Sequence, residues 1–118
     1  MPGWFSGANT YNVVKEAFLT NKGYSNELSK HMSQEVFRTT NIYNAYPINN
    51  KETYKVNFSL KEDSRIKIGG TVYVKMTYSV EIMDSNNVLV GGSSHISIKF
   101  TIKNIKGEWY ITDKYEPA

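Results

Sequence analysis

The sequence predicts an α+β domain in which N-terminal helices pack in the concave face of a strongly bent antiparallel sheet. Apolar and polar residues alternate along 72–82 and 96–102, and again at Trp109 and Ile111. This period of two is typical of strands that bury one face. Turn-forming residues separate these stretches closely, which favours antiparallel pairing. Before residue 40, apolar residues recur at spacings of three and four, which indicates helices.

The composition is that of one globular domain. The chain has 118 residues, and we expect an N-terminal arm over residues 1–8 and a single domain over residues 9–118. With no cysteine and two histidines, it offers no disulfide and no metal-ligand set, so we expect neither a metal nor a cofactor. No apolar run is long enough for a transmembrane segment. The net charge of +3 comes mostly from lysine, which argues against nucleic acid because arginine is the preferred reader of phosphates and bases.

The first helix is expected from a cap at Asn9 or Thr10 to about Lys22, where Gly23 stops it. Its inner face would carry Tyr11, Val14, Ala17 and Phe18.

The second helix is expected from Ser25 to about Thr40, and its apolar face would carry Leu28, Met32 and Val36. Residues 39–46 are ambiguous, because their β-branched and aromatic side chains also suit a short strand. Pro47 breaks the chain after them.

The first long strand should bury Tyr54, Val56, Phe58 and Leu60 and end in a turn over residues 62–65. A three-residue loop over residues 63–65 would place Phe58 opposite Gly70. Residues 84–87 form the next turn, and either a three-residue loop or a bulge at Gly91-Gly92 would set Met76 beside Ile96. Both glycine pairs, 69–70 and 91–92, are interpreted as strand bends.

The last hairpin is expected at Lys106-Gly107. As a two-residue loop, this pair makes Ile102 face Ile111 and Phe100 face Asp113.

The order of helices and strands, ending in KGEWYITDKYEP, resembles the nuclear-transport-factor-2-like superfamily, whose members have a cone-shaped α+β fold. The segment from Gly107 to Ile111 is similar to the closing turn and strand of small exported or lipoprotein-type members from Gram-positive bacteria. The resemblance implies an extracytoplasmic protein, in the cell envelope or secreted, with its leader missing; a cytoplasmic location stays open. It does not choose a function, because this fold serves enzymes, ligand binders and assembly domains.

A ligand pocket inside the cone is one candidate site. Asp113 would lie on the inner face, where an apolar surrounding raises a carboxyl pKa; the alternative is a wet position at the rim. His31 is either a general base or pocket hydrogen-bonder, or a histidine at the helix boundary. The candidate lining is Tyr11, Phe18, His31, Met32, Tyr78, Phe100, Trp109 and Asp113.

Ser94 and His95 are adjacent in a strand, so their side chains should point to opposite faces. They are therefore not expected to form a catalytic pair. The outer face of the sheet is the second candidate site, as a docking surface for an anionic partner; the alternative is a solvated face whose lysines discourage edge pairing. Its expected residues are Lys55, Lys67, Tyr73, Lys75, Lys99, Lys103 and Tyr110, with Lys61, Thr77 and Lys114 nearby.

No catalytic pair emerges from the sequence, so the leading hypothesis is a non-catalytic domain for protein–protein or ligand contact in a bacterial cell-envelope assembly. The partner would be an unknown protein, or a second copy bound through the sheet, and a small apolar ligand is a further candidate. One alternative is a small-molecule-binding or enzymatic pocket of the isomerase or dehydratase type. Another is an assembly domain of a conjugation apparatus.

Overall fold

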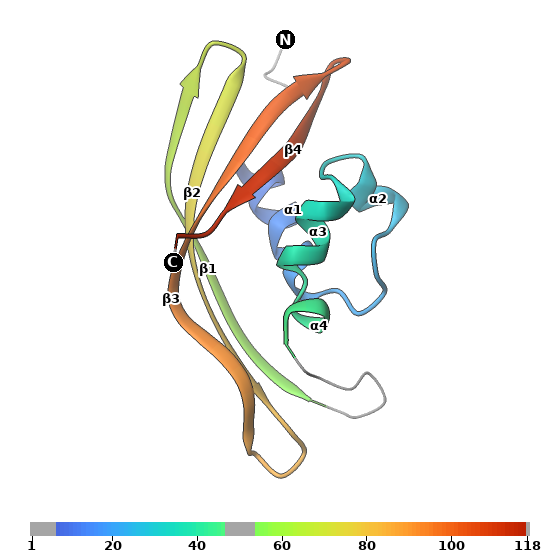
Figure 1. Ribbon diagram of the computed structural model, residues 1–118, viewed down its shortest axis with the longest axis vertical. Coiled ribbons are helices and arrows are strands. Elements are labelled where there is room, and N and C mark those ends of the chain that lie inside the picture. Colours follow the sequence, from blue (N-terminus) through green and yellow to red (C-terminus); the bar gives the residue numbers. More distant parts are fainter. Residues whose placement is uncertain (1–6, 47–53, 118) are drawn as a thin grey trace.

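The structure is a computed structural model that describes residues 7–46 and 54–117, and it has the α+β class predicted from the sequence. Four short helices precede a four-stranded antiparallel sheet with strand order β1-β2-β3-β4 in these residues. The sheet is curved, and the helices lie on its concave side (Figure 1). The helices are α1 (Gly7–Leu19), α2 (Asn26–Ser29), α3 (Gln34–Thr40) and α4 (Ile42–Ala45), and the strands are β1 (Lys55–Ile68), β2 (Thr71–Met83), β3 (Leu89–Ile105) and β4 (Glu108–Tyr115).

Helix α1 begins earlier and ends earlier than predicted, at Gly7 and Leu19. Residues 7 and 8 therefore belong to the helix, while the rest of the expected N-terminal arm lies outside the described residues. The expected inner face is confirmed for Val14, Ala17 and Phe18, which are buried. Tyr11 is half-buried, and its hydroxyl donates a hydrogen bond to the Leu60 carbonyl oxygen at 3.0 Å.

The second predicted helix is wrong as one element, because residues 30–33 separate α2 from α3. Here the backbone pairs with β4: the Ile111 N–H donates to the His31 carbonyl at 2.8 Å, and the Ser33 N–H donates to the Ile111 carbonyl at 3.3 Å. Ser33 then caps α3, since its Oγ accepts from the Val36 N–H at 3.1 Å. Pairing with a distant strand thus replaces a turn of helix.

Residues 42–45 form helix α4 rather than a strand, and Asn41 explains why. Its buried side chain caps α4 by accepting from the Tyr43 N–H at 3.1 Å. The same side chain donates to the carbonyl oxygens of Ala17 and Thr20, at 2.9 and 2.8 Å. The predicted break at Pro47 lies outside the described residues.

The predicted turn at residues 62–65 is wrong, because β1 continues through it to Ile68. The extra polar residue is absorbed as a bulge at Asp63, and the chain turns at Gly69-Gly70 instead. Gly69 has φ +62°, which suits glycine in a tight hairpin turn. Phe58 consequently pairs with Val80 and not with Gly70.

The predicted turn at residues 84–87 is confirmed, and the Asp84 carboxylate accepts from the backbone N–H groups of Asn86 and Val88. Strand β3 holds two irregularities, one at Val90 and one where Ser94 and His95 together oppose Ser79. They flank the glycine pair at which a bulge was one expectation. Met76 therefore pairs with Ile98, which corrects the expected pairing with Ile96.

The last hairpin turns at Lys106-Gly107 as predicted, and Ile102 pairs with Ile111. Thr112 is then an extra residue in β4, so Phe100 pairs with Lys114 and not with Asp113. Because a shift of one residue reverses the faces of a strand, Lys114 points toward the helices and Asp113 points away from them.

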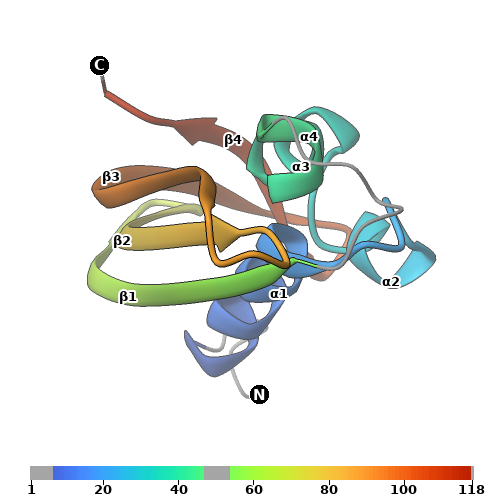
Figure 2. The ribbon, with the colours of Figure 1, turned by 90° about the horizontal axis from the view of Figure 1, so that it is seen from below.

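The core lies between the helices and the concave face of the sheet, and Figure 2 shows the helices grouped on that side. Val74 and Ile98 are buried on this face, as the alternation predicts. Other fully buried side chains come from all parts of the chain: Val14, Met32, Ile42, Ile82, Phe100, Ile102 and Ile111.

Candidate functional site

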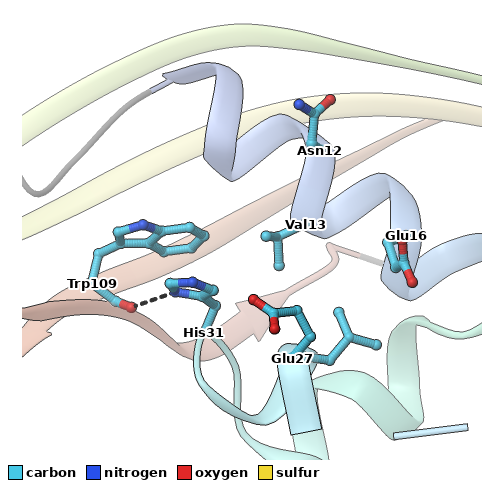
Figure 3. Close-up of a pocket in the computed structure, with 7 residues that line it drawn as sticks. Asn12, Val13, Glu16, Glu27, His31 and Trp109 are labelled. Atoms are coloured by element: carbon cyan, nitrogen blue, oxygen red, sulfur yellow. Dashed lines mark hydrogen bonds between the residues drawn. The ribbon is translucent and has the colours of Figure 1, made fainter. Parts of the chain in front are cut away.

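A surface pocket of about 370 Å³ lies between α1, α2 and the start of β4. Figure 3 shows Val13 and Glu27 facing His31 and Trp109, with Glu16 further along α1 and Asn12 pointing away from them. Asn12, Val13 and Glu16 come from α1, Glu27 and Leu28 from α2, and His31 and Trp109 from the segment after α2 and from β4. The close approach of residues 31–33 to β4 holds these elements together.

His31 is fixed in this pocket by Trp109. The two rings stack with centroids 4.0 Å apart and planes 16° from parallel. His31 Nδ1 lies 3.1 Å from the Trp109 carbonyl oxygen (Figure 3). Because a carbonyl oxygen can only accept, Nδ1 carries the proton, and a neutral His31 ring then presents Nε2 as an acceptor.

The carboxylates of Glu16 and Glu27 give this pocket an acidic lining. Glu27 forms an ion pair with Lys30 at 3.6 Å, in which both side chains are mostly exposed. Such a pair is weak, because water solvates both charges.

The residues predicted to line a pocket inside the cone do not come together as one cavity lining. Phe18, Met32 and Phe100 are buried within one apolar core, as is Tyr78, whose ring centroid lies 4.7 Å from that of Phe18. Tyr11 is bonded to Leu60. His31 and Trp109 are the two predicted residues that line the surface pocket, and Trp109 also belongs to this core.

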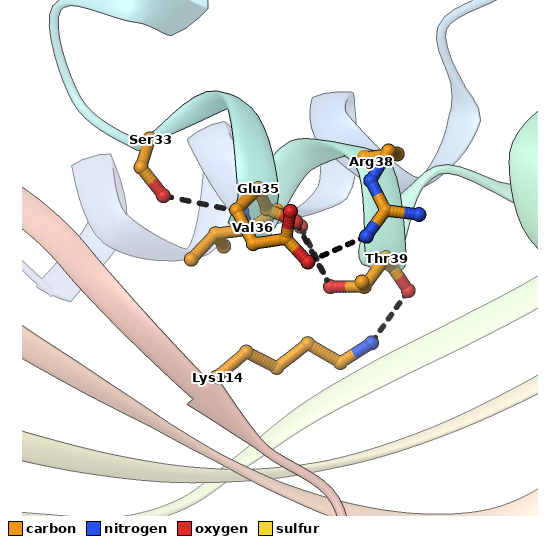
Figure 4. A network of polar contacts seen from close by, with 6 residues as sticks. All are labelled: Ser33, Glu35, Val36, Arg38, Thr39 and Lys114. Atoms are coloured by element: carbon orange, nitrogen blue, oxygen red, sulfur yellow. Dashed lines mark hydrogen bonds and ion pairs between the residues drawn. The ribbon is translucent and has the colours of Figure 1, made fainter.

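Asp113 is exposed and pairs with Thr101 on the face away from the helices, which corrects its expected inward position. The bulge at Thr112 is the cause. Lys114 takes the inward position, where its Nζ donates to the Thr39 carbonyl oxygen at the end of α3 at 2.6 Å (Figure 4). It also lies 3.6 Å from the Glu116 carboxylate.

Burial changes the proton affinity of two groups in this region. It lowers the pKa of Lys114, and the nearby Glu116 carboxylate opposes that shift only in part. Burial is the largest cause of the raised pKa of Tyr78, and the negative charge of Glu116 is the second. The Tyr78 hydroxyl donates to the Glu116 carboxylate at 3.3 Å. The arrangement holds the phenol protonated and ties the end of β4 to the sheet.

Ser94 and His95 do form a hydrogen bond, between Oγ and Nδ1 at 2.8 Å, contrary to the sequence expectation. The bulge is the reason: His95 has φ +53°, so the two side chains do not alternate across the sheet. The Ser79 Oγ accepts from the His95 N–H at 2.9 Å and supports this backbone. Both side chains are exposed, so water competes for the contact and a nucleophile here would not be shielded.

The open sheet face, defined here by Ile66, Ile68, Tyr73, Lys75, Lys99, Lys103, Asp113 and Tyr115, is the second candidate site. These residues occupy neighbouring positions on the side of the sheet opposite the helices. Ile66, Ile68 and Tyr115 are 54%, 64% and 60% exposed. Lys99 Nζ lies 5.8 and 5.9 Å from the ring centroids of Tyr73 and Tyr115.

The predicted docking residues are placed mostly as expected. Lys55 is exposed on the same side of the sheet, opposite Met83, and Tyr110 pairs with Lys103. Lys67 is a correction: it pairs with the buried Val72 and so has the inward register, because of the bulge at Asp63. The same bulge turns Ile66 and Ile68 outward, which the sequence analysis missed.

Sequence reasoning also missed five pocket residues, although a signal was present. Asn12 and Glu16 are four residues apart in the first predicted helix, and Glu27 and His31 are four residues apart in the second, a spacing that places each pair on one side of a helix. What the spacing could not give was the approach of α2 to α1 and β4.

No protein-family model matches the chain, and no curated protein is significantly similar to it. The helices that the structure describes include none long and apolar enough to cross a membrane. Within residues 7–46 and 54–117, no group of three or more His, Asp or Glu side chains is placed to hold a metal ion.

Proposed function

We propose that this protein is a non-catalytic binding domain of the nuclear-transport-factor-2-like type that docks an acidic protein surface on its open sheet face. The observation that carries the proposal is the exposure of Ile66 and Ile68 beside exposed lysines on that face. A bacterial cell-envelope assembly is the proposed setting, supported by the resemblance of the C-terminal segment. The curved sheet with helices on its concave side suits the cone-shaped fold of that superfamily (Figure 1).

Large apolar side chains on a sheet face cost free energy in water, and contiguous groups of them mark interaction surfaces. Here two isoleucines and Tyr115 are each more than half exposed. Lys99 lies over the rings of Tyr73 and Tyr115, which favours a defined position for its charge. The exposed apolar side chains thus lie on the edge strands β1 and β4, and the lysines lie between them on β2 and β3. Such a mixture of apolar and charged side chains is compatible with a protein–protein interface.

The charges favour an acidic partner over a second copy. Among the residues that define the open sheet face, Lys75, Lys99 and Lys103 carry positive charges and Asp113 carries the single negative charge. A two-fold pairing of this face would bring lysines of both copies together in a partly desolvated interface, which is unfavourable. A partner that places carboxylates against the lysines of β2 and β3 and apolar side chains against the isoleucines of β1 satisfies both features.

Selection from a displayed peptide library tests the proposal. The wild-type protein should enrich peptides that combine Asp or Glu with large apolar residues, and a selected peptide should shift the amide resonances of Ile66, Lys75 and Lys99. Lys75→Glu with Lys99→Glu should abolish this binding. The matched control is Lys15→Glu with Lys22→Glu, which makes the same charge change at two exposed residues, one in α1 and one after it. This control should bind as the wild type does.

Three outcomes contradict the proposal. The first is enrichment of peptides without acidic residues, and the second is equal loss of binding in both double variants. The third is a stable dimer or ring of the protein alone in native mass spectrometry, which would assign the face to self-assembly, as in the conjugation-apparatus alternative.

A further inference from the structure

We infer that the pocket between α1, α2 and β4 binds a small organic cation with a primary ammonium group and a short apolar chain. This site is separate from the open sheet face, since its residues lie on the helix side of the sheet (Figure 3). The inference rests on the hydrogen-bonding character, the charge and the shape of the lining.

The polar groups of the lining are mostly acceptors. The carboxylates of Glu16 and Glu27 can only accept when ionised. His31 donates its Nδ1–H to the Trp109 carbonyl, so the neutral ring offers Nε2 as a third acceptor. A primary ammonium carries three donors and one positive charge, so it suits a lining rich in acceptors. Figure 3 draws the Glu27 carboxylate on the His31 side of the pocket and Glu16 at its other end.

The lining carries negative charge, which disfavours an anionic ligand and favours a cationic ligand over a neutral one. The protein as a whole has a net charge of +3, yet both ionised residues among the seven lining this pocket are glutamates. Lys30 forms an ion pair with Glu27, but this pair is exposed and easily exchanged for a ligand cation. Glu16 forms no ion pair with any residue that the structure describes.

The remaining lining supports a short apolar chain. Val13 and Leu28 form apolar walls, and Trp109 with the stacked His31 forms a flat aromatic one. The stacking and the hydrogen bond to Trp109 hold the imidazole in place, so little side-chain entropy remains to be lost on binding. The volume of about 370 Å³ is near the lower end of small-molecule sites, which begin at about 300 Å³.

The test is a titration of the ¹⁵N-labelled protein at about pH 8, where imidazoles are ordinarily neutral, with three probes of equal chain length: pentylammonium, 1-pentanol and pentanoate. Pentylammonium should give saturable shifts at the amides of Glu16, Glu27, His31 and Trp109. Pentanol should bind at least about tenfold more weakly, because charge-assisted hydrogen bonds are lost. Pentanoate should not bind.

Glu16→Gln combined with Glu27→Gln should remove pentylammonium binding while the spectrum stays that of a folded protein. Glu35→Gln is the matched control, since Glu35 is an exposed helical glutamate whose ion pair is with Arg38, away from the pocket. The inference is overturned if the double variant binds like the wild type, if pentanol binds as well as pentylammonium, or if the shifts map elsewhere. Because these variants leave Lys75 and Lys99 intact, failure here does not affect the docking proposal.

Discussion

At the scale of single residues, Asn41 connects two helices, α1 and α4, through one buried side chain. Its amide group donates to the last turn of α1 and just beyond, at Ala17 and Thr20, and accepts from Tyr43 in α4. A buried amide that makes three hydrogen bonds is costly to remove, because each partner is left without its bond.

We therefore expect Asn41→Ala to lower the free energy of unfolding by roughly 2 to 4 kcal/mol, from about 1 kcal/mol for each hydrogen bond plus the cost of unsatisfied partners. Asn41→Asp should be worse, since it places a carboxylate against two carbonyl oxygens. Urea denaturation gives these values. Asn44→Ala, at an exposed position of α4, is the control and should change stability by less than about 0.5 kcal/mol. Equal effects at both positions would contradict this role of Asn41.

Lys114 gives a second residue-scale prediction, through pH. Its pKa is lowered in the folded protein by burial, so between that value and the ordinary 10.5 the unfolded chain binds more protons than the folded one. Stability contributed by this group therefore rises with pH in that window. As the pH approaches 10.5, the free energy of unfolding of the wild type should increase relative to that of Lys114→Met. A constant difference between the two proteins would contradict a buried, shifted ammonium.

The faces of individual residues were the least predictable feature. The alternation predicted the buried positions of β2 correctly. In its pairing with β1, the extra residue lies on β1 at Asp63, so β2 itself keeps a regular alternation. In β1 and β4, one extra residue at Asp63 or Thr112 reversed every face beyond it. Asp and Thr carry no local signal for a bulge, so Lys67, Asp113 and Lys114 were placed on the wrong faces.

At the scale of elements, the segment of residues 31–33 pairs with the outer edge of β4 at Ile111. The backbone bonds of Ile111 to His31 and Ser33 satisfy groups that an edge strand would otherwise expose. The same segment positions His31 against Trp109 and starts α3 at Ser33. One irregular stretch thus builds the pocket wall and protects the sheet.

The Ser33 cap gives the element-scale prediction. Ser33→Ala should lower the free energy of unfolding by about 1 kcal/mol, because the Val36 N–H loses its acceptor, whereas Ser33→Asp should keep most of the stability. Thermal or urea unfolding measures both (the contact is drawn in Figure 4). Ser29→Ala removes a donor hydroxyl near the end of α2 and serves as the control with a smaller effect. If Ser33→Asp were as unstable as Ser33→Ala, capping would not be the cause.

The break between α2 and α3 could be read only in part from the sequence. Ser33 is a suitable helix cap, but the spacing of Leu28, Met32 and Val36 favours one continuous helix. The pairing of Met32 with Ile111 decides between them, and that contact joins distant parts of the chain. Helix periodicity cannot report a tertiary contact of this kind, so the pocket that depends on it was also hidden.

At the scale of the whole molecule, the helices cover one side of the sheet and leave the other side open (Figures 1 and 2). The candidate pocket lies on the covered side and the open sheet face on the other. Partner docking and cation binding therefore use different residues, and a variant of one site should leave the other unchanged.

The stability of the whole fold should fall at alkaline pH, because two tyrosines hold their protons more tightly when folded. Burial, then the neighbouring Tyr110 hydroxyl, raises the pKa of Tyr24 from 10.0 to about 12, and its hydroxyl donates to the Met32 carbonyl oxygen at 2.6 Å. Burial also raises the pKa of Tyr78, to which Glu116 adds.

Above pH 10.0 the unfolded chain loses these phenolic protons while the folded protein keeps them, so the free energy of unfolding decreases as the pH rises toward about 12. Lys114 acts in the opposite direction but only up to 10.5. Urea denaturation at a series of pH values should show this decline, and Tyr24→Phe should make it shallower because one of the two contributions is absent. Tyr115→Phe, at an exposed position of the open sheet face, is the matched control. An unchanged slope in Tyr24→Phe would show that this phenol is not held protonated by the fold.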